Sequence, residues 1–434
     1  MRVLITGAYG FIGQHIASGL MQEGHQIVAC GRDVQLGKRL LPNAHWLHCD
    51  FNQDLTEDSW RNRLTGIDVV INCVGILQTT ARDSHERIHA TAPIALFRAA
   101  AACGIRRVIQ ISALGAEPDT GTAYSDSKSL ADSALKKLDV DWVILKPSLV
   151  YAHGSYGGTT LIRALAGLPG VIPLIDGGKH RFQPVSMSYL VSVVSALILP
   201  DAPSRIEVAV CGPEAKTLRE IVLAIRRWLG FASPRFINLP KVFALPLLWL
   251  GDIASWFGLT TAFNRTSLRQ MEIGNTASPK DVISTSGIVP LSIESELENT
   301  PSTLQDRLHA RSAFAMAMLR TTLGLFWIAT GAITLHPLVH AIAFDQLCAA
   351  GIPPKIAHLF VTTGAMADIA LGLPFLVGWR TRLIGLLQLA MMIFYIAFAC
   401  ALLPHLLLDP FGPILKIIPI AMATLVVIAW AEPR

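Results

Sequence analysis

Tyr124 and Lys128 are spaced as a proton-transfer pair, because the segment YSDSK places the lysine four residues after the tyrosine. On a helix, residues four apart lie on one face. An ammonium group beside a phenol lowers the pKa of the phenol from about 10, so we predict that Tyr124 serves as a general acid or base near neutral pH. Ser112 ends the apolar run RRVIQIS and is predicted to orient a carbonyl or hydroxyl group against the same phenol.

Three glycines near the N-terminus are spaced to hold a dinucleotide. Gly7, Gly10 and Gly13 have GxxGxxG spacing and stand between the apolar run 3–5 and an apolar-periodic helix. Such glycines let the backbone turn tightly, approach a pyrophosphate and pack a helix against a strand, and the helix N-terminus then faces the phosphates. The alternative is an ordinary glycine-rich turn. The loop residues that we predict to bind the cofactor are Thr6, Gly7, Tyr9, Gly10, Phe11, Ile12 and Gly13.

Arg32 and Asp33, at the end of the second apolar run, decide which dinucleotide we expect. A carboxylate at this place binds the ribose hydroxyls of NAD, whereas an arginine binds the extra phosphate of NADP. Because Arg32 comes first and a guanidinium fits a phosphate well, NADP(H) is favoured over NAD(H). Asp33 could reverse that preference, and Arg32 could instead be a solvated loop residue.

A sheet and helices must position these residues, and the pattern of the chain predicts both. Six apolar runs alternate with helical stretches up to about residue 150, which is typical of an α/β Rossmann-type fold with a doubly wound parallel sheet. Residues 151–300 have mixed polarity and are predicted to form most of a small substrate lobe, with a helix near 218–229. The apolar segment 243–259 is interrupted by Pro246 and Asp252, and is either a helix at a membrane interface or a buried core helix. The six runs are RVLITG, HQIVACG, HWLHCD, DVVINCVG, RRVIQISALG and DWVILKPSLVY.

The composition indicates a membrane protein, because 52% of the 434 residues are hydrophobic and only 15% are charged. The formal charge of +5 comes without a dense Lys/Arg run, so we expect no nucleic-acid partner. Seven cysteines are scattered without metal-ligand spacing, which predicts no metal site and a reducing compartment. Met1 leads directly into a strand with no cleavable leader, so the N-terminal domain is expected to be cytosolic.

Four apolar blocks after residue 300 each have the length of a membrane-spanning helix. With residues 301–312 as a linker, residues 313–434 are predicted to form an all-α bundle of four transmembrane helices, the alternative being a soluble bundle. Arginines before the first block and between the second and third place both termini and the nucleotide domain on the cytosolic side of the plasma (inner) membrane. The blocks are 317–336, 356–378, 383–404 and 412–431, and the arginines are Arg307, Arg311, Arg320, Arg380, Arg382 and Arg434.

Asp368 lies inside the second block. A carboxylate is costly there and usually faces the bundle interior or a water-filled cavity. Asp368 could mark a quinone or proton site, or it could form a structural hydrogen bond to a Ser, Thr or His on a neighbouring helix.

Residues 1–300 resemble the extended or atypical short-chain dehydrogenase/reductases. The resemblance rests on TGAYGFIG, INCVGI, LKPSLVY and the set Ser112, Tyr124 and Lys128. It implies that the tyrosine exchanges the proton, that the lysine also bonds the nicotinamide ribose, and that Asp50 in the segment HCDF contacts the adenine. The further residues assigned to the cofactor on this basis are Phe51, Cys73, Val74, Gly75 and Pro147.

Two parts of the chain resemble narrower families. ISALGAEPDTGTAYSDSK and GKHRFQPVSM are most similar to the nucleotide-binding accessory subunit of respiratory complex I and its bacterial relatives, in which a bound NADPH is structural. The chain departs from these relatives with Ser188 in place of an aspartate and His89 in place of an asparagine. The tail from about residue 313 resembles the DoxX-like four-helix membrane family, in GAMADIALGLPFLVGWRTRL and LDPFGPILKIIP.

Three functions are open on this basis. The first is a membrane-anchored NADP(H)-dependent oxidoreductase that acts on a hydrophobic carbonyl or quinone-like substrate, with the lipid bilayer as its partner. The second is a non-catalytic NADPH-binding scaffold or assembly factor with a membrane-protein partner. The third, a nucleotide-sugar epimerase or dehydratase, fits the extended family but gives no reason for membrane spans.

Overall fold

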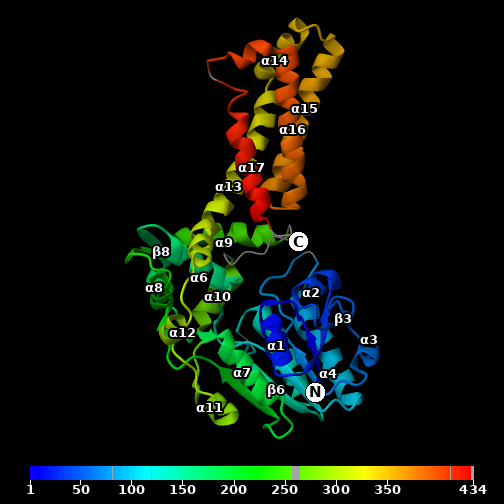
Figure 1. Ribbon diagram of the computed structural model, residues 1–434, viewed down its shortest axis with the longest axis vertical. Helices are drawn as coiled ribbons and strands as arrows, with labels where there is room; N and C mark the ends of the chain where they lie inside the picture. Colours follow the sequence, from blue (N-terminus) through cyan, green and yellow to red (C-terminus); the bar gives the residue numbers. More distant parts are fainter. Residues whose placement is uncertain (81, 119, 257–263, 411, 432–434) are drawn as a thin grey trace. The chain divides into compact units, whose positions relative to one another are not determined.

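The computed structural model describes residues 1–80, 82–118, 120–256, 264–410 and 412–431. The chain divides into two compact units, Met1–Ala310 and Arg311–Arg434, and each is described by itself. The first unit holds a large sheet with its helices, and the second is helical (Figure 1).

A seven-stranded parallel sheet forms the centre of the first unit, with strand order β11-β6-β5-β4-β1-β2-β3. All six predicted strands are present, and β11 adds a seventh beside β6. The predicted doubly wound Rossmann fold is thereby confirmed. Because the strand order reverses between β1 and β4, their carboxyl ends flank the crevice in which open α/β sheets bind ligands. The strands are β1 Arg2–Thr6, β2 Gln26–Gly31, β3 His45–His48, β4 Val69–Asn72, β5 Arg107–Ile111, β6 Asp141–Pro147 and β11 Ile206–Val210.

Helices cover both faces of this sheet because its central strands are apolar on both sides. The strands β4 and β5 are buried along their whole length. One core cluster packs α1 and α7 on the sheet through Ile16, Leu20 and Val193, and a second packs α4 and α5 through Leu96 and Leu135. The helices are α1 Phe11–Gln22, α2 Val34–Leu40, α3 Asp58–Arg61, α4 Ala92–Ala102, α5 Ala123–Leu135 and α7 Met187–Leu197, with the turns η1 Asn62–Leu64 and η2 Glu86–Thr91.

Short strands and helices form the smaller lobe. The helix predicted near 218–229 is confirmed as α8, which begins with a capping box: the Thr217 hydroxyl accepts a hydrogen bond from Glu220 N–H, and the Glu220 carboxylate accepts one from Thr217 N–H. The strands are β7 Val150–Tyr151, β8 Val171–Ile175, β9 Arg181–Phe182, β10 Val185–Ser186, β12 Lys216–Thr217 and β13 Arg235–Leu239. The helices are α6 Gly158–Gly167, η3 Asp176–Gly178, α8 Leu218–Trp228, α9 Lys241–Trp256, α10 Arg265–Ile273, α11 Lys280–Ser286 and α12 Ile293–Asn299.

The helix α9 covers most of the apolar segment for which the sequence left two interpretations. Ala244 and Leu248 are buried, whereas Val242, Phe243 and Trp249 are 54% to 67% exposed. One side of α9 therefore packs on the lobe, and another presents exposed apolar side chains, with the Arg265 guanidinium 4.6 Å from the centre of the Trp249 ring. Residues 257–259 of the segment lie outside the described residues.

Helices of membrane length make up most of the second unit. In the part of the chain that the structure describes, three helices, α13, α15 and α16, are long and apolar enough to cross a bilayer, and they coincide with the first three predicted spans. The fourth predicted span coincides with α17, whose 14 residues are fewer than the about 20 that a crossing helix needs. Since α13 begins at Leu304, most of the predicted linker is helical. The elements are α13 Leu304–Leu335, α14 Pro337–Ala349, α15 Pro354–Leu376, α16 Thr381–Leu402, η4 Pro404–Leu407 and α17 Ile417–Trp430.

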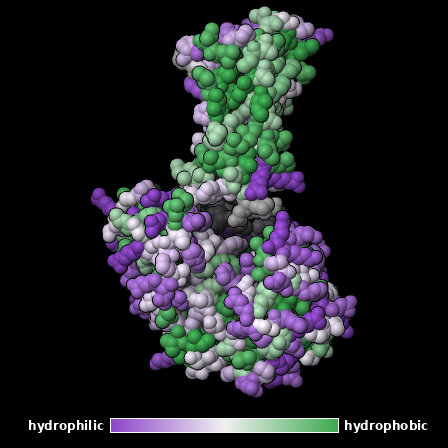
Figure 2. Space-filling view, in the orientation of Figure 1, coloured by the Kyte–Doolittle hydropathy of each residue, from purple (hydrophilic) through white to green (hydrophobic). Residues whose placement is uncertain are grey.

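Small residues let the helices of the second unit approach one another closely. A Cβ on Gly331 of α13 would lie 2.4 Å from the carbonyl oxygen of Ala365, and a Cβ on Gly372 of α15 would lie 2.8 Å from the backbone nitrogen of Ile328. On the face that Figure 2 shows, most of the surface of these helices is apolar, as contact with lipid requires.

Asp368 faces the interior of this bundle. It is 4% exposed, and its Oδ1 accepts a hydrogen bond of 2.8 Å from the hydroxyl of Tyr395 on α16. The partner is thus a tyrosine, and not the Ser, Thr or His that the sequence analysis considered.

Candidate active site

The glycine loop between β1 and α1 leaves room for a phosphate group. Gly7 has a φ of +67°, which L side chains rarely adopt. A Cβ on Gly13 would lie 2.2 Å from the carbonyl oxygen of Gly7, and a Cβ on Gly10 would lie 3.0 Å from the same atom. Only glycines therefore allow the first turn of α1 to close against the loop. This cradle at a helix N-terminus fits the pyrophosphate of a dinucleotide.

The Tyr9 side chain connects the glycine loop with the end of β2. Its hydroxyl accepts hydrogen bonds from the backbone N–H groups of Arg32, at 3.2 Å, and Asp33, at 3.3 Å. Its ring stacks on Trp46 with 5.9 Å between centroids, and a Cβ on Gly31 would lie 2.3 Å from a ring carbon. One side chain thus holds the phosphate loop to the turn that is predicted to recognise the ribose.

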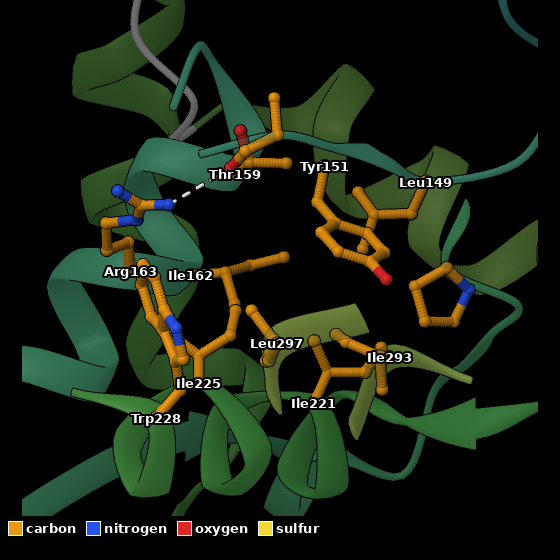
Figure 3. Close-up of a pocket in the computed structure, with 12 residues that line it drawn as sticks. Leu149, Tyr151, Thr159, Ile162, Arg163, Ile221, Ile225, Trp228, Ile293 and Leu297 are labelled. Atoms are coloured by element: carbon orange, nitrogen blue, oxygen red, sulfur yellow. Dashed lines mark hydrogen bonds between the residues drawn. The ribbon is translucent and has the colours of Figure 1, made fainter. Parts of the chain in front are cut away.

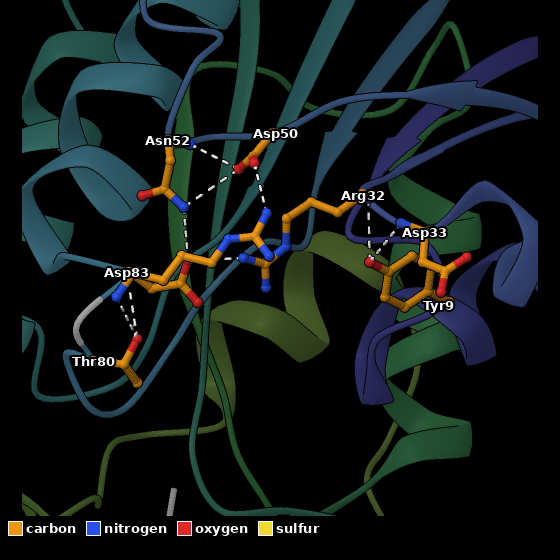
Figure 4. Close-up of polar contacts among 8 residues, drawn as sticks. Tyr9, Arg32, Asp33, Asp50, Asn52, Thr80 and Asp83 are labelled. Atoms are coloured by element: carbon orange, nitrogen blue, oxygen red, sulfur yellow. Dashed lines mark hydrogen bonds and ion pairs between the residues drawn. The ribbon is translucent and has the colours of Figure 1, made fainter. Parts of the chain in front are cut away.

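Two arginines lie at this end of the crevice, each paired with a carboxylate (Figure 4). Arg32 donates to Asp83 at 2.7 Å, and Arg82 donates to Asp50 at 3.0 Å. Asn52 joins the two pairs, since its Nδ2 donates to Asp83 at 2.7 Å and to Asp50 at 3.3 Å. Residues 82 and 83 are therefore held against the carboxyl ends of β2 and β3.

The two aspartates predicted at this end of the site are both engaged in protein contacts. Burial opposes the ionisation of Asp50, but hydrogen bonds from Asn52 N–H and from Arg82 hold the pKa of Asp50 below its usual range. Asp33 caps α2, with its Oδ1 accepting from Leu36 N–H at 2.8 Å. The side chain of Asp33 therefore has a structural role that does not depend on binding a ribose.

Buried side-chain amides hold the carboxyl ends of β1, β4 and β5 together. The Thr6 hydroxyl donates to Asn72 Oδ1 at 2.7 Å, and Asn72 Nδ2 donates to Gln110 Oε1 at 2.8 Å. Asn72 Oδ1 also accepts from Val74 N–H at 3.2 Å, which directs the segment 73–75 along the crevice. Burial raises the pKa of the Cys73 thiol to about 12, so this thiol is neutral.

Tyr124 and Lys128 lie on α5 next to that segment. The Lys128 Nζ is 5.9 Å from the centre of the Tyr124 ring and donates to the carbonyl oxygen of Ile111 at 3.2 Å. A Cβ on Gly75 would lie 3.6 Å from the same Nζ, and a Cβ on Gly7 would lie 3.1 Å from the Val74 side chain. The segment 73–75 therefore connects the glycine cradle with the lysine.

The predicted lowering of the Tyr124 pKa is wrong. Burial raises the pKa of this phenol above its usual value, and the nearby Asp132 raises it further. Burial also lowers the pKa of Lys128, an effect that Asp132 and Cys73 partly offset. Desolvation disfavours both the tyrosinate form of Tyr124 and the ammonium form of Lys128. For Tyr124 it outweighs the attraction of the Lys128 ammonium, because that ammonium donates to the Ile111 carbonyl oxygen and not to the phenol oxygen.

Ser112 is hydrogen-bonded to a carboxylate that was not among the predicted site residues. Its hydroxyl donates to Asp132 Oδ2 at 2.5 Å, and both side chains are buried. Burial raises the pKa of Asp132, although the hydrogen bond from Ser112 and the charge of Lys128 oppose this. Within the described ranges, Asp132 Oδ1 has no hydrogen-bond partner. The spacing of four residues between Lys128 and Asp132 is the signal that could have identified this carboxylate.

His89 joins the segment after β4 to α5. Its Nε2 accepts from Ile76 N–H at 2.9 Å, so the ring proton is on Nδ1, which donates to Ser127 Oγ at 3.1 Å. Ser127 in turn donates to the carbonyl oxygen of Tyr124 at 3.0 Å. Burial and the charge of Lys128 hold the pKa of His89 well below its usual range, so this imidazole is neutral.

A π-helical turn brings a second histidine to the phenol. The turn η2 follows His85, and the rings of His85 and His89 stack with 5.2 Å between centroids. Both rings meet the Tyr124 ring edge-on, at 6.0 Å and 5.3 Å. Turns of this type are frequent at functional sites, and His85 was not predicted.

The other predicted cofactor residues lie in different surroundings. Phe11 begins α1 beside the half-buried Ile12 and stacks on Tyr156 with 5.8 Å between centroids. Pro147 ends β6 at the carboxyl edge of the sheet. Phe51 is 3% exposed and packs edge-on against Trp60, so it belongs to the core below the site. Among the residues that the structure describes, no group of three or more His, Cys, Asp or Glu side chains is placed to hold a metal ion.

Two known families match the two parts of the chain. Residues 7–166 match an NAD(P)H-binding family, and residues 324–425 match the DoxX-like family. The chain therefore carries an NAD(P)H-binding, oxidoreductase-like Rossmann domain followed by a DoxX-like domain with membrane-length apolar helices. The predicted nucleotide-binding domain and the resemblance of the tail to the DoxX-like family are confirmed.

Two curated relatives are similar to the first part. A ceramide reductase of Caulobacter vibrioides is 26% identical over 262 residues, which are 59% of this chain and 79% of that protein. The mitochondrial NADH dehydrogenase (ubiquinone) 1 alpha subcomplex subunit 9 of Arabidopsis thaliana is 29% identical over 256 residues, which are 54% of this chain and 60% of that protein. The predicted similarity to the complex I subunit is confirmed.

One solved structure of similar fold is the NADPH-dependent quinone oxidoreductase of Escherichia coli, determined with NADPH. Its TM-score is 0.54 at 18% identity, and the match covers 68% of this chain and 99% of that one. Identity this low shows the fold alone.

Proposed function

We propose that this protein is a membrane-anchored, NADP(H)-dependent oxidoreductase that acts on a hydrophobic carbonyl or quinone-like substrate. The observation that carries the proposal is the arrangement of Tyr124, Lys128 and Ser112 at the end of the segment that starts from the glycine cradle. The same chain has helices of membrane length, which would keep such a site close to lipid-soluble substrates. A relative that is by name a ceramide reductase also supports a lipid substrate.

The proposed chemistry uses the neutral phenol of Tyr124. Bound in the cradle, NADPH would supply the hydride that the carbonyl carbon needs. Tyr124 donates its proton to the carbonyl oxygen, so that carbonyl, hydride and proton together give an alcohol. Because burial raises the pKa of Tyr124, the phenol is protonated at neutral pH and suited to act as an acid. The Lys128 ammonium then stabilises the tyrosinate that remains.

We propose NADP(H) rather than NAD(H) as the cofactor. Arg32 supplies a guanidinium at the end of β2, where the extra phosphate of NADP binds in this fold. Arg82 supplies a second guanidinium nearby, because both arginines bond into the network around Asn52. A phosphate at this place would compete with Asp83 for Arg32.

We also propose that the second unit spans the plasma (inner) membrane four times, with both termini and the nucleotide domain cytosolic. The arginines before α13 and between α15 and α16 support this orientation. The fourth crossing would use α17 together with the turn that precedes it. A fluorescent protein fused after residue 434 should fluoresce, and alkaline phosphatase inserted at residue 351 should be active. The opposite pattern would reverse the orientation.

A non-catalytic NADPH-binding scaffold is the second candidate. The similarity to the complex I subunit favours it, and so does the hydrogen bond that directs the Ser112 proton to Asp132. In a scaffold, replacement of Tyr124 by Phe would leave the role intact.

The experiment uses the full chain purified in detergent. NADPH oxidation is measured with long-chain ketones and short-chain quinones for wild type, Tyr124→Phe and Tyr189→Phe. Loss of the phenol at 124 should lower turnover by about 10²- to 10⁴-fold without changing the Kd for NADPH. Tyr189→Phe is the control, because Tyr189 lies on α7 and its hydroxyl donates to the carbonyl oxygen of Ile288. Equal turnover in Tyr124→Phe would refute the assigned role. Absence of any oxidation, together with exchange of bound NADPH over hours, would support the scaffold.

A further inference from the structure

One face of α9 presents large apolar side chains on the surface of the first unit. Val242, Phe243 and Trp249 are 63%, 67% and 54% exposed, and Pro246 is exposed as well. Positions 242, 246 and 249 are three to four residues apart, so they form one stripe along the helix. The opposite face of α9 is buried against the lobe. An exposed apolar stripe of this kind marks an interaction surface.

Cations border this stripe. Lys241 begins α9, and Arg265 and Arg269 lie on the neighbouring helix α10. Glu272 pairs with both Lys241 and Arg269, and Asp252 pairs with Arg265, so three cations face two carboxylates and one positive charge is in excess. Apolar and aromatic side chains beside cations match the interfacial zone of a bilayer, where tryptophan rings lie at the headgroups and cations meet anionic lipids.

The first helix of membrane length starts in the same lobe. Residues 304–310 of α13 belong to the first unit, and the Asp306 carboxylate accepts a hydrogen bond of 3.2 Å from Arg163 of α6, which lies against the Trp228 ring (Figure 3). A Cβ on Gly167 of α6 would lie 2.5 Å from the carbonyl oxygen of Ala310. The predicted first span begins at residue 317, about 10 Å further along the helix. The lobe is therefore held close to the bilayer that α13 is able to cross.

A short strand connects the start of α13 with α9. The helix α6 ends at Gly167, against Ala310, and β8 begins at Val171. The last residue of β8, Ile175, packs on the buried face of α9. Five residues of strand span about 17 Å, so α9 and the start of α13 are attached to opposite ends of one short element.

The helix α10 connects the same surface with the candidate active site. Its Leu268 packs against the buried face of α9. The side-chain amide of Gln270 donates to the hydroxyls of Thr122, at 2.8 Å, and Ser125, at 2.9 Å. These two residues flank Tyr124 at the start of α5. Only α10 therefore stands between the stripe on α9 and the first turn of the helix that carries the phenol.

We propose that the exposed face of α9 binds the surface of a lipid bilayer, with Phe243 and Trp249 among the headgroups and the bordering cations facing anionic lipids. The tether through α13 favours lipid over a protein partner, because it keeps a bilayer at a high effective concentration near this face. The inference does not depend on the proposed reaction, since contact with lipid needs no turnover.

The test places a photoreactive side chain at the proposed contact. The full chain, with p-benzoylphenylalanine in place of Phe243, is reconstituted into vesicles of phosphatidylcholine and phosphatidylglycerol, irradiated, and searched for phospholipid adducts by mass spectrometry. The matched control carries the same group in place of Val289, which is 66% exposed in the same unit. We expect about tenfold more lipid adduct at position 243 than at position 289.

Three results would overturn the proposal. The first is an equal yield of lipid adducts at the two positions. The second is a cross-link from position 243 to another copy of the chain, which would make this face a contact between copies. The third is a cross-link from position 243 to α13–α17, which would show that the chain covers the stripe with its own helices.

A substitution and a change of lipid test the two parts of the surface. Trp249→Glu sets a carboxylate into the stripe and should lower the adduct yield at position 243 by about tenfold, whereas Val289→Glu should not change it. The melting temperature of both variants, measured in the same vesicles, checks that the lobe stays folded. Replacement of phosphatidylglycerol by phosphatidylcholine should lower the yield by about two- to fivefold, and an unchanged yield would refute the role of the cations.

Discussion

The hydroxyl of Ser112 donates its proton to Asp132 over 2.5 Å inside the first unit. While Asp132 is ionised, Ser112 can accept a hydrogen bond from a substrate but has no proton left to donate. When Asp132 is protonated, the carboxyl group can donate to Ser112, and the serine hydroxyl becomes available to a carbonyl oxygen. Since burial raises the pKa of Asp132, the protonated form persists to a higher pH than for an exposed aspartate.

Replacement of Asp132 by Asn should therefore change the pH dependence of carbonyl reduction. In the wild type, we expect kcat/KM to rise as the pH falls through the pKa of Asp132, because protonation frees the Ser112 hydroxyl. Asp132→Asn has no proton to exchange, so its profile should be flat in this range, with a loss at the optimum of less than about tenfold. Asp132→Ala removes the partner of Ser112 and should cost roughly ten- to hundredfold. Identical pH profiles in wild type and Asp132→Asn would contradict this role.

Cofactor preference should depend on Arg32. Loss of a charge-assisted hydrogen bond to phosphate costs about 1.5–3 kcal/mol, so Arg32→Ala should weaken NADPH binding by roughly ten- to hundredfold and leave NADH binding nearly unchanged. Asp83→Asn should act in the opposite direction, because it removes the carboxylate that competes for Arg32. Fluorescence titration of both cofactors measures the effect, with Arg39→Ala at an exposed position of α2 as the control. Equal weakening of both cofactors by Arg32→Ala would assign the arginine a structural role.

Acid should destabilise the protein partly through His89. Burial lowers the pKa of this imidazole, so the folded protein resists a proton that the unfolded chain binds below about pH 6.5. The stability contributed by a neutral His89 is present above that pH and is lost as the pH falls. We expect the apparent melting temperature to fall below about pH 6.5, and to fall less in His89→Asn, whose amide can keep both hydrogen bonds. His45→Asn, a substitution at an exposed position, is the control. Parallel curves for wild type and His89→Asn would exclude this source of acid sensitivity.

The contact between Asp368 and Tyr395 should stabilise the helical unit. In Tyr395→Phe the buried carboxylate loses a donor at 2.8 Å, and an unsatisfied buried polar group costs about 1–3 kcal/mol. A lower unfolding temperature in detergent is the expected result. Tyr156→Phe, at a side chain that is 70% exposed, should not change it. If both variants unfold at the same temperature as the wild type, another hydrogen-bond partner satisfies Asp368 when the Tyr395 hydroxyl is removed.

The strands and the long helices could be predicted from the sequence because their hydropathy patterns are local. Central parallel strands read as continuous apolar runs, and Ser112 and Pro147 come at the ends of two of them. Tyr124 and Lys128 were found because four residues of separation on a helix imply one face. By contrast, α14 has only 13 residues, and an apolar stretch of that length between two spans is not distinguishable from a loop by pattern alone.

The missed residues depend on contacts between distant parts of the chain. Arg82 and Asp83 meet the ends of β2 and β3 across more than thirty residues of sequence, and no local pattern indicates that pairing. The pKa of Tyr124 was predicted in the wrong direction because the spacing reveals its cationic neighbour, whereas the extent of its burial emerges only in the folded chain.

The contacts of Tyr9 also bear on how cofactor preference could evolve. Its hydroxyl accepts from the backbone N–H groups of Arg32 and Asp33, so exchange of the Arg32 side chain would keep this contact, whereas the side chain of Asp33 also caps α2. Gly31 has no such freedom, because any larger residue would collide with the Tyr9 ring. Descendants of this chain could thus switch between the two dinucleotides through residues 32 and 83, while positions 9 and 31 remain under selection.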